Sequence, residues 1–269
     1  MTLILTEILP SGIIMAADSA LTKTTTLPNG NVTYFVLTGV HKLQVIEKLN
    51  AGISTWGMGA IPPKYTQTDI WLQDFIYNQR GNYDSLHDFA ILLQNELRRH
   101  IPPITVDKKT FNIENLGTIG FHLAGYVDYN GRKTPTLYHI HNGISYVLDP
   151  QGTKIDPTIV NANHDLPPDE VQKKLSQGIE LPLYRNGDWF LAARFFNLVG
   201  NFFDSLSKQD GLTVPDSRNL KERTEWLRFQ IRTMSELYRL SNLHLPTIGG
   251  KIDTLIITPN GVDDCGLTL

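Results

Sequence analysis

The first twenty residues, Met1 to Ala20, read MTLILTEILPSGIIMAADSA and decide the fold. They contain two short apolar runs separated by a Pro-Ser-Gly turn, a pattern typical of a buried β-hairpin. The second run ends in Asp18 and Ser19, a carboxylate and a hydroxyl at the point where a buried strand reaches the surface. If the strands pair across the turn at Gly12, Asp18 returns to the start of the chain. The sequence therefore predicts that polar groups meet at the open end of this hairpin.

The start of the chain carries a candidate nucleophile. Removal of Met1 would leave Thr2 as the first residue, with a free α-amine and a hydroxyl on one unit. A threonine in this position can act as a nucleophile because its own amine serves as the base. The hairpin therefore predicts acyl-transfer chemistry at Thr2, with the carboxylate of Asp18 close by.

Further motifs follow in order along the chain. They are Lys42 before an apolar strand at 43–46, a glycine turn at 57–60, a hairpin near 115–140, and Ile248-Gly249-Gly250 before the last strand. Their order and spacing resemble the proteasome β subunits and the related bacterial HslV protease, over most of residues 2–150 and 245–265. The resemblance implies the fold of the N-terminal nucleophile (Ntn) hydrolases, a four-layer αββα sandwich of two antiparallel sheets between helical layers.

The order of the predicted elements indicates an α+β fold without reference to any family. Helical periodicity occurs in blocks that separate groups of strands, at 66–77, 85–100, 188–203 and 219–240. We expect one domain over residues 1–269, with an insertion at about 151–245 that is longer than the family's equivalent. Residues 151–183 are rich in Pro, Asp, Asn and Lys, which predicts a surface segment with little core.

The resemblance implies catalytic roles for four residues. Thr2 is the nucleophile, Lys42 and Asp18 tune its protonation, and Gly57 donates its N–H to the oxyanion. Ser19 is a fifth candidate, which we expect to orient Asp18. The physical chemistry of the residues agrees with these roles. A cation held beside a carboxylate in a partly buried site lowers the proton affinity of a neighbouring amine or hydroxyl. A glycine turn can direct backbone N–H groups toward a developing negative charge.

The chain departs from the family at the positions that support the nucleophile. Asn186 begins an Asn-Gly-Asp sequence where the family has a serine, and no aspartate precedes the last Gly-Gly strand. Asn186, Ser241 and Thr247 are the candidate replacements. Thr55 and Leu21 are expected to line a substrate pocket.

Composition limits the class of protein. Of the 269 residues, 41% are hydrophobic and 19% are charged, which is ordinary for a globular chain. The net charge of −3 argues against nucleic acid as a partner. Cys265 is the single cysteine, which fits a reducing cytoplasm. No apolar run approaches the roughly 20 residues of a membrane helix, and the start lacks the basic region of a secretory signal.

His139 and His141 alternate onto one face of a predicted strand and form a candidate metal pair. No third ligand stands at a telling spacing, and neither HExxH nor a phosphate-binding loop occurs. We therefore expect neither a metal nor a cofactor.

The leading hypothesis is a threonine peptidase that cleaves peptides or unfolded proteins and assembles as a homo-oligomeric ring, with any unfoldase partner unknown. The first alternative is a catalytically silent structural subunit that retains Met1. The second is a hydrolase of small amides on the same fold.

Overall fold

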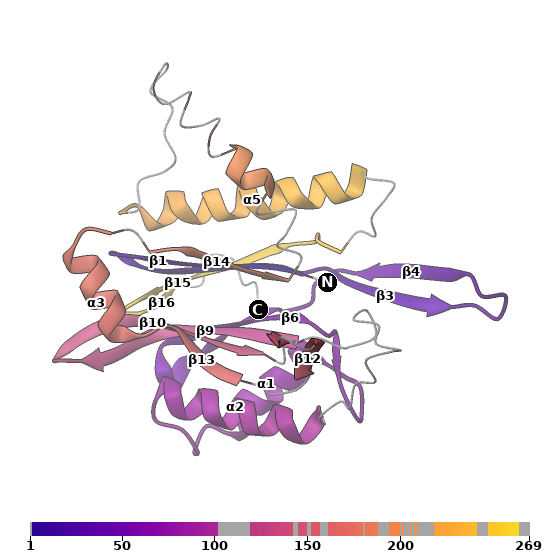
Figure 1. Cartoon of the computed structure of the whole chain (residues 1–269), viewed down its shortest axis with the longest axis horizontal. Coiled ribbons are helices and arrows are strands. Elements are labelled where there is room, and N and C mark those ends of the chain that lie inside the picture. Colours follow the sequence, from indigo (N-terminus) through magenta and orange to yellow (C-terminus); the bar gives the residue numbers. More distant parts are fainter. Residues whose placement is uncertain are drawn as a thin grey trace.

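The structure is a computed structural model. It describes residues 2–101, 119–141, 145–149, 152–156, 161–179, 181–187, 194–199, 201, 205, 208, 218–240 and 247–263. Two five-stranded antiparallel sheets lie face to face, and helices cover their outer faces (Figure 1). The predicted α+β class is therefore confirmed.

The first sheet has the strand order β14-β1-β2-β15-β16. Its strands are β14 (Leu183–Gly187), β1 (Leu3–Leu9), β2 (Gly12–Asp18), β15 (Ile252–Thr258) and β16 (Gly261–Asp263). The central hairpin of β1 and β2 is buried along its whole length. Its register pairs Ile4 with Ala17, so Asp18 returns to the start of the chain as predicted. The last strands close the sheet on the other side of β2.

The second sheet has the order β13-β10-β9-β6-β5. Its strands are β13 (Asn161–Leu166), β10 (Arg132–His141), β9 (Ile119–Tyr129), β6 (Ala51–Gly57) and β5 (Leu43–Ile46). The predicted hairpin of β9 and β10 turns at Asn130 and Gly131, which both have positive φ angles. The side chains alternate along β9. Phe121 and Leu123 pack toward the helices, whereas Ala124 packs between the sheets.

Two helices cover the outer face of the second sheet (Figure 1). They are α1 (Thr68–Asn78) and α2 (Leu86–His100). Ser85 caps the N-terminus of α2, because its side chain accepts a hydrogen bond from the backbone N–H of Asp88 at 3.1 Å. Basic residues occupy the last turn of α2, where their positive charges interact favourably with the helix dipole.

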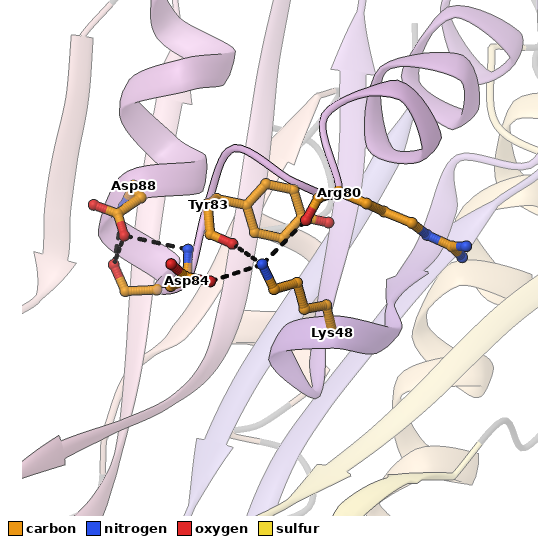
Figure 2. A network of polar contacts seen from close by, with 6 residues as sticks. Lys48, Arg80, Tyr83, Asp84 and Asp88 are labelled. Atoms are coloured by element: carbon orange, nitrogen blue, oxygen red, sulfur yellow. Dashed lines mark hydrogen bonds and ion pairs between the residues drawn. The ribbon is translucent and has the colours of Figure 1, made fainter.

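The loop between α1 and α2 is held by one lysine, as Figure 2 shows. Lys48, in the short helix η1 (Glu47–Leu49), donates to the carbonyl oxygens of Arg80 and Tyr83 and pairs with Asp84 at 2.7 Å. The ammonium therefore satisfies carbonyl groups that follow the end of α1. These contacts tie the two outer helices to the edge of the second sheet.

The outer face of the first sheet is covered by α5 (Leu220–Leu240), predicted at 219–240 (Figure 1). Its Leu227, Ile231 and Met234 pack against Leu3 and Leu5 of β1 in one apolar cluster. The helix is also held by charge, because Arg223 donates two hydrogen bonds to the buried carboxylate of Glu7.

The prediction that residues 151–183 form a surface segment with little core was wrong. β13 extends the second sheet, and α3 (Pro168–Ser176) places Val171 between the sheets beside Leu166. β13 is an edge strand, and its sequence Asn161–Leu166 is mostly polar. It therefore lacks the apolar alternation from which a strand is predicted. Residues 194–199 and 201 are helical, and the other positions of the helix predicted at 188–203 lie outside the described residues.

Three small two-stranded sheets complete the described chain. The Thr-rich hairpin over residues 21–37 projects beyond the two large sheets (Figure 1). The strands are β3 (Leu21–Thr26) with β4 (Val32–Leu37), β7 (Ala60–Ile61) with β8 (Thr66–Gln67), and β11 (Ser145–Asp149) with β12 (Gly152–Asp156). In the part of the chain that the structure describes, no helix is long and apolar enough to cross a bilayer.

Candidate active site

Asp18 is the hub of the candidate site. It ends β2 and is 1% exposed. Its carboxylate accepts four hydrogen bonds at 3.0–3.2 Å, from the backbone N–H groups of Leu3, Ala20 and Gly249 and from Nζ of Lys42. The ammonium and the backbone N–H groups together satisfy both oxygens of this buried carboxylate. Asp18 therefore joins the start of the chain to the loop before β15.

Lys42 lies just before β5 and is 4% exposed. Its Nζ is 3.0 Å from Oδ1 of Asp18 and also donates to the carbonyl oxygen of Ala20. Burial lowers the pKa of Lys42 from its ordinary value, although the nearby carboxylates of Asp18 and Asp69 act in the opposite direction. A buried ammonium with a lowered pKa can take part in proton transfer.

Thr2 lies at the mouth of the β1–β2 hairpin and is 4% exposed. It lines a cavity of about 20 Å³ together with Lys42 and Gly57. That volume is enough for about one water molecule. Thr55 and Leu21, the residues predicted to line a pocket, line the same cavity.

Gly57 ends β6 with a φ angle of +92°, in the left-handed region that favours glycine. The turn that follows, through Met58 and Gly59, also lines the cavity. Gly57, the predicted oxyanion donor, therefore lines the same small cavity as Thr2.

Ser19 is attached to the site through its backbone. Its N–H donates to the carbonyl oxygen of Gly249 at 3.1 Å, and its own carbonyl oxygen accepts from Val40 at 3.1 Å. Its hydroxyl is buried against Gly250, without a hydrogen-bond partner among the described residues. The role predicted for this hydroxyl, orienting Asp18, stays a prediction.

The candidate replacements for the family's supporting residues have different positions. Asn186, in β14, places Oδ1 2.6 Å from Nε2 of His122. Thr247 is buried shortly before β15. Ser241 lies outside the described residues.

The histidine cluster behind the cavity was missed by the sequence analysis except for its two members on β10. The rings of His139 and His141 lie 4.3 Å apart, and the ring of His122 lies 5.2 Å from that of His139. The ring of Trp56, which lines the cavity, is 5.9 Å from the ring of His139. His122 could have been added to this cluster from the sequence. The strands β9 and β10 were predicted to pair, and His122 on β9 lies opposite His139 on β10. Within the described ranges, no group of three or more His, Cys, Asp or Glu side chains could hold a metal ion.

Comparisons with known proteins agree with the fold. No protein-family model and no curated protein matches the chain. Among solved structures, it is similar to an Anbu (Gly-1) mutant from Hyphomicrobium sp. strain MC1, at 13% identity and a TM-score of 0.50, with 99% of this chain and 86% of that chain covered. Anbu (ancestral beta-subunit) from Yersinia bercovieri gives 12% identity and a TM-score of 0.49, with 99% and 88% covered.

The predicted family assignment was therefore wrong. The solved structure that matches at a TM-score of 0.50 is an Anbu protein, of a proteasome-like family distinct from the proteasome β subunits and HslV to which the motifs were assigned. The motifs describe the hairpin, the lysine and the glycine turns of a shared fold, and such features do not separate families built on that fold. At 13% identity the likeness shows the fold alone.

Proposed function

We propose that this chain is a threonine-type N-terminal nucleophile hydrolase that cleaves amide bonds through an acyl-enzyme on Thr2. The observation that carries the proposal is the single cavity lined by Thr2, Lys42 and Gly57. A hydroxyl nucleophile, a buried ammonium and a glycine backbone are the groups that acyl transfer requires. The fold likeness supports a four-layer αββα framework of the Ntn-hydrolase type, as one domain with an enlarged insertion at about 151–245.

The reaction starts after Met1 has been removed. The α-amine of Thr2 takes the hydroxyl proton as Oγ1 attacks the amide carbonyl carbon. Negative charge then develops on the carbonyl oxygen, where the N–H of Gly57 is the proposed donor. The amine returns the proton to the leaving nitrogen, the C–N bond breaks, and the acyl group remains as an ester on Thr2. Water attacks this ester with the amine again as base, which releases the acid and restores the hydroxyl.

The pair of Lys42 and Asp18 sets the charge around the nucleophile. The positive charge of Lys42 disfavours protonation of the nearby α-amine of Thr2. The amine therefore stays neutral, and able to accept a proton, at a lower pH than a free amine would. Asp18 fixes the ammonium, because the two groups are 3.0 Å apart and both are buried. Asp18 also fixes the backbone of the next residue, Leu3, with a hydrogen bond of 3.0 Å.

Peptides and unfolded proteins are the proposed substrates, and a homo-oligomer is the proposed assembly. The second candidate is hydrolysis of small amides. The small size of the cavity beside Thr2, which holds about one water molecule, is the observation behind this candidate. A panel that compares peptides with small acylated amines separates the two substrate classes.

The test of the nucleophile is intact mass before and after treatment with a peptide epoxyketone, a reagent that needs both the hydroxyl and the free amine of an N-terminal threonine. We expect loss of Met1 and one adduct per chain, with no adduct on the Thr2→Ala variant. A retained Met1 with no adduct would overturn the proposal in favour of the silent structural subunit. Native mass of the same sample gives the number of subunits.

A further inference from the structure

A chain of hydrogen bonds crosses the interior between the two sheets, close to the start of β1. The hydroxyl of Thr6, on β1, is 2.9 Å from Nδ1 of His122 on β9. Nε2 of the same imidazole is 2.6 Å from Oδ1 of Asn186 on β14. Because an amide oxygen only accepts, Nε2 carries the proton and Nδ1 accepts from Thr6. Both nitrogens of the neutral imidazole are thus satisfied.

The sequence of groups in this chain is that of a nucleophile, a base and an orienting amide, but its position excludes catalysis. Thr6 and His122 are both 0% exposed, so no substrate reaches the hydroxyl. The imidazole is also kept neutral. Burial, followed by the neighbouring His139, lowers the pKa of His122 to about 3. A neutral buried imidazole with both nitrogens paired is a rigid strut between three strands.

The residue after Asn186 contacts the nucleophile directly. Gly187 has a φ angle of +88°, and a Cβ built on it would lie 1.8 Å from the carbonyl oxygen of Thr2. No larger residue fits, so the backbone of β14 packs against the backbone of Thr2. The register continues the contact, with Leu3 opposite Gly187 and Ile4 opposite Asn186.

We propose that His122 is a positioning residue for the nucleophile, acting through Asn186 and Gly187 on the backbone of Thr2. The imidazole fixes the amide of Asn186, which holds the end of β14 in register with β1. Gly187 then limits where the carbonyl group of Thr2 can lie. The catalytic meaning of this contact rests on the proposed function, whereas the mechanical coupling does not. Asn186 thereby supports the nucleophile from the place where the chain lacks the expected serine.

The coupling is tested with three variants and one control. His122→Phe keeps a ring but removes both hydrogen bonds, and Asn186→Leu removes the acceptor. His122→Gln restores an amide N–H near the position of Nε2. Ile140→Val is the control, since Ile140 is equally buried but packs toward the helical face of the second sheet.

Two readouts are compared across these variants, namely hydrogen exchange of the amides of residues 3–5 and the kinetics of peptide hydrolysis. We expect His122→Phe and Asn186→Leu to speed exchange about tenfold and to lower kcat about 10- to 100-fold with KM within about twofold, because a displacement of about 1 Å is enough to misalign a nucleophile. His122→Gln recovers a large part of both quantities, and Ile140→Val resembles the unmodified protein.

Unchanged exchange at residues 3–5 in a folded His122→Phe variant would overturn the inference, as would an equal effect of Ile140→Val. If His122→Phe does not fold, Thr6→Val is used in both measurements instead, because it keeps the shape of the side chain. The same results then support or overturn the inference. Failure of the proposed function has a different signature. The unmodified protein then forms no epoxyketone adduct, while the exchange measurement still decides the coupling.

Discussion

At the scale of single residues, the site depends on charges that the fold has removed from water. Asp18 receives its hydrogen bonds from residues 3, 20, 42 and 249, so one carboxylate organises four parts of the chain. Lys42 is the only one of these partners that carries a charge. Its contribution to chemistry is therefore separable from the contribution of the backbone donors.

Replacement of Lys42 by methionine keeps the length of the side chain and removes its charge. We expect the rate of epoxyketone adduct formation on Thr2 to fall about 100-fold or more, because the amine loses the neighbour that keeps it neutral. Lys23→Met, on the exposed hairpin, is the matched control and should react at the unmodified rate. A Lys42→Met protein that folds and reacts within about threefold of that rate would contradict the role.

Sequence reasoning found the residues that are close in the chain or repeat a familiar spacing, and it missed the rest. Thr2, Asp18 and Lys42 belong to the first 42 residues. The β1–β2 hairpin brings Asp18 back to Thr2, and the side chain of Lys42 reaches Asp18 from the segment before β5. His122 and Asn186 are 64 residues apart and meet only because β9 and β14 belong to facing sheets. No local periodicity encodes such a contact.

At the scale of elements, α5 is fastened to the first sheet by both apolar packing and charge. Its apolar stripe, which the sequence periodicity indicated, lies on β1 and β2. The ion pair of Arg223 with Glu7 was not predicted, because its partners are 216 residues apart. The strand β14 was missed for a related reason, since Leu183–Gly187 has no alternating pattern and is ordered by its partner β1.

Removal of the charge of Arg223 should destabilise the protein strongly. Arg223→Met leaves the carboxylate of Glu7 buried without its partner, and we expect the free energy of unfolding to fall by about 3–5 kcal/mol. Urea denaturation measures the change, with Lys221→Met on the exposed face of α5 as the control.

The double variant Glu7→Leu with Arg223→Met should recover most of the lost stability, because it removes both charges together. An unfolding midpoint of Arg223→Met equal to that of Lys221→Met would show that the ion pair contributes nothing.

At the scale of the whole molecule, the neutral histidines between the sheets make stability depend on pH. The pKa of His122 is about 3 in the folded protein and ordinarily 6.5, so the unfolded chain binds the proton first as pH falls. Its contribution is complete above pH 6.5 and is lost as pH falls toward 3. Burial also lowers the pKa of His141, to about 4, which acts in the same direction.

Between pH 6.5 and pH 4, His122 should therefore remove about 1.4 kcal/mol of stability per pH unit. Urea midpoints at pH 7, 6 and 5 measure this slope for the unmodified protein and for His122→Phe. The variant should start less stable but lose less of its stability across this range. Parallel slopes for the two proteins would contradict a buried, neutral His122.

The sequence predicted the architecture of the chain better than it predicted the family of its structural neighbours. Block order predicted the α+β class, because each block buries its own face, whereas the two stacked antiparallel sheets were implied by the resemblance. The family assignment failed because these patterns describe burial and turns, which proteins on one fold share. The interpretation of residues 151–183 as a surface segment failed because polar edge strands such as β13 show no periodicity.

Asp18 and its hydrogen-bond partners lie far apart in the sequence, which affects when the candidate site can form during synthesis on the ribosome. Gly249 is 231 residues beyond Asp18 and supplies one of its hydrogen bonds. A ribosome adds roughly 5–20 residues per second, so the first hairpin is made many seconds before its last partner exists. The nascent chain carries Thr2 throughout this interval without a finished site around it. The reactivity proposed for Thr2 is thus delayed until Gly249 has emerged and supplied its hydrogen bond to Asp18.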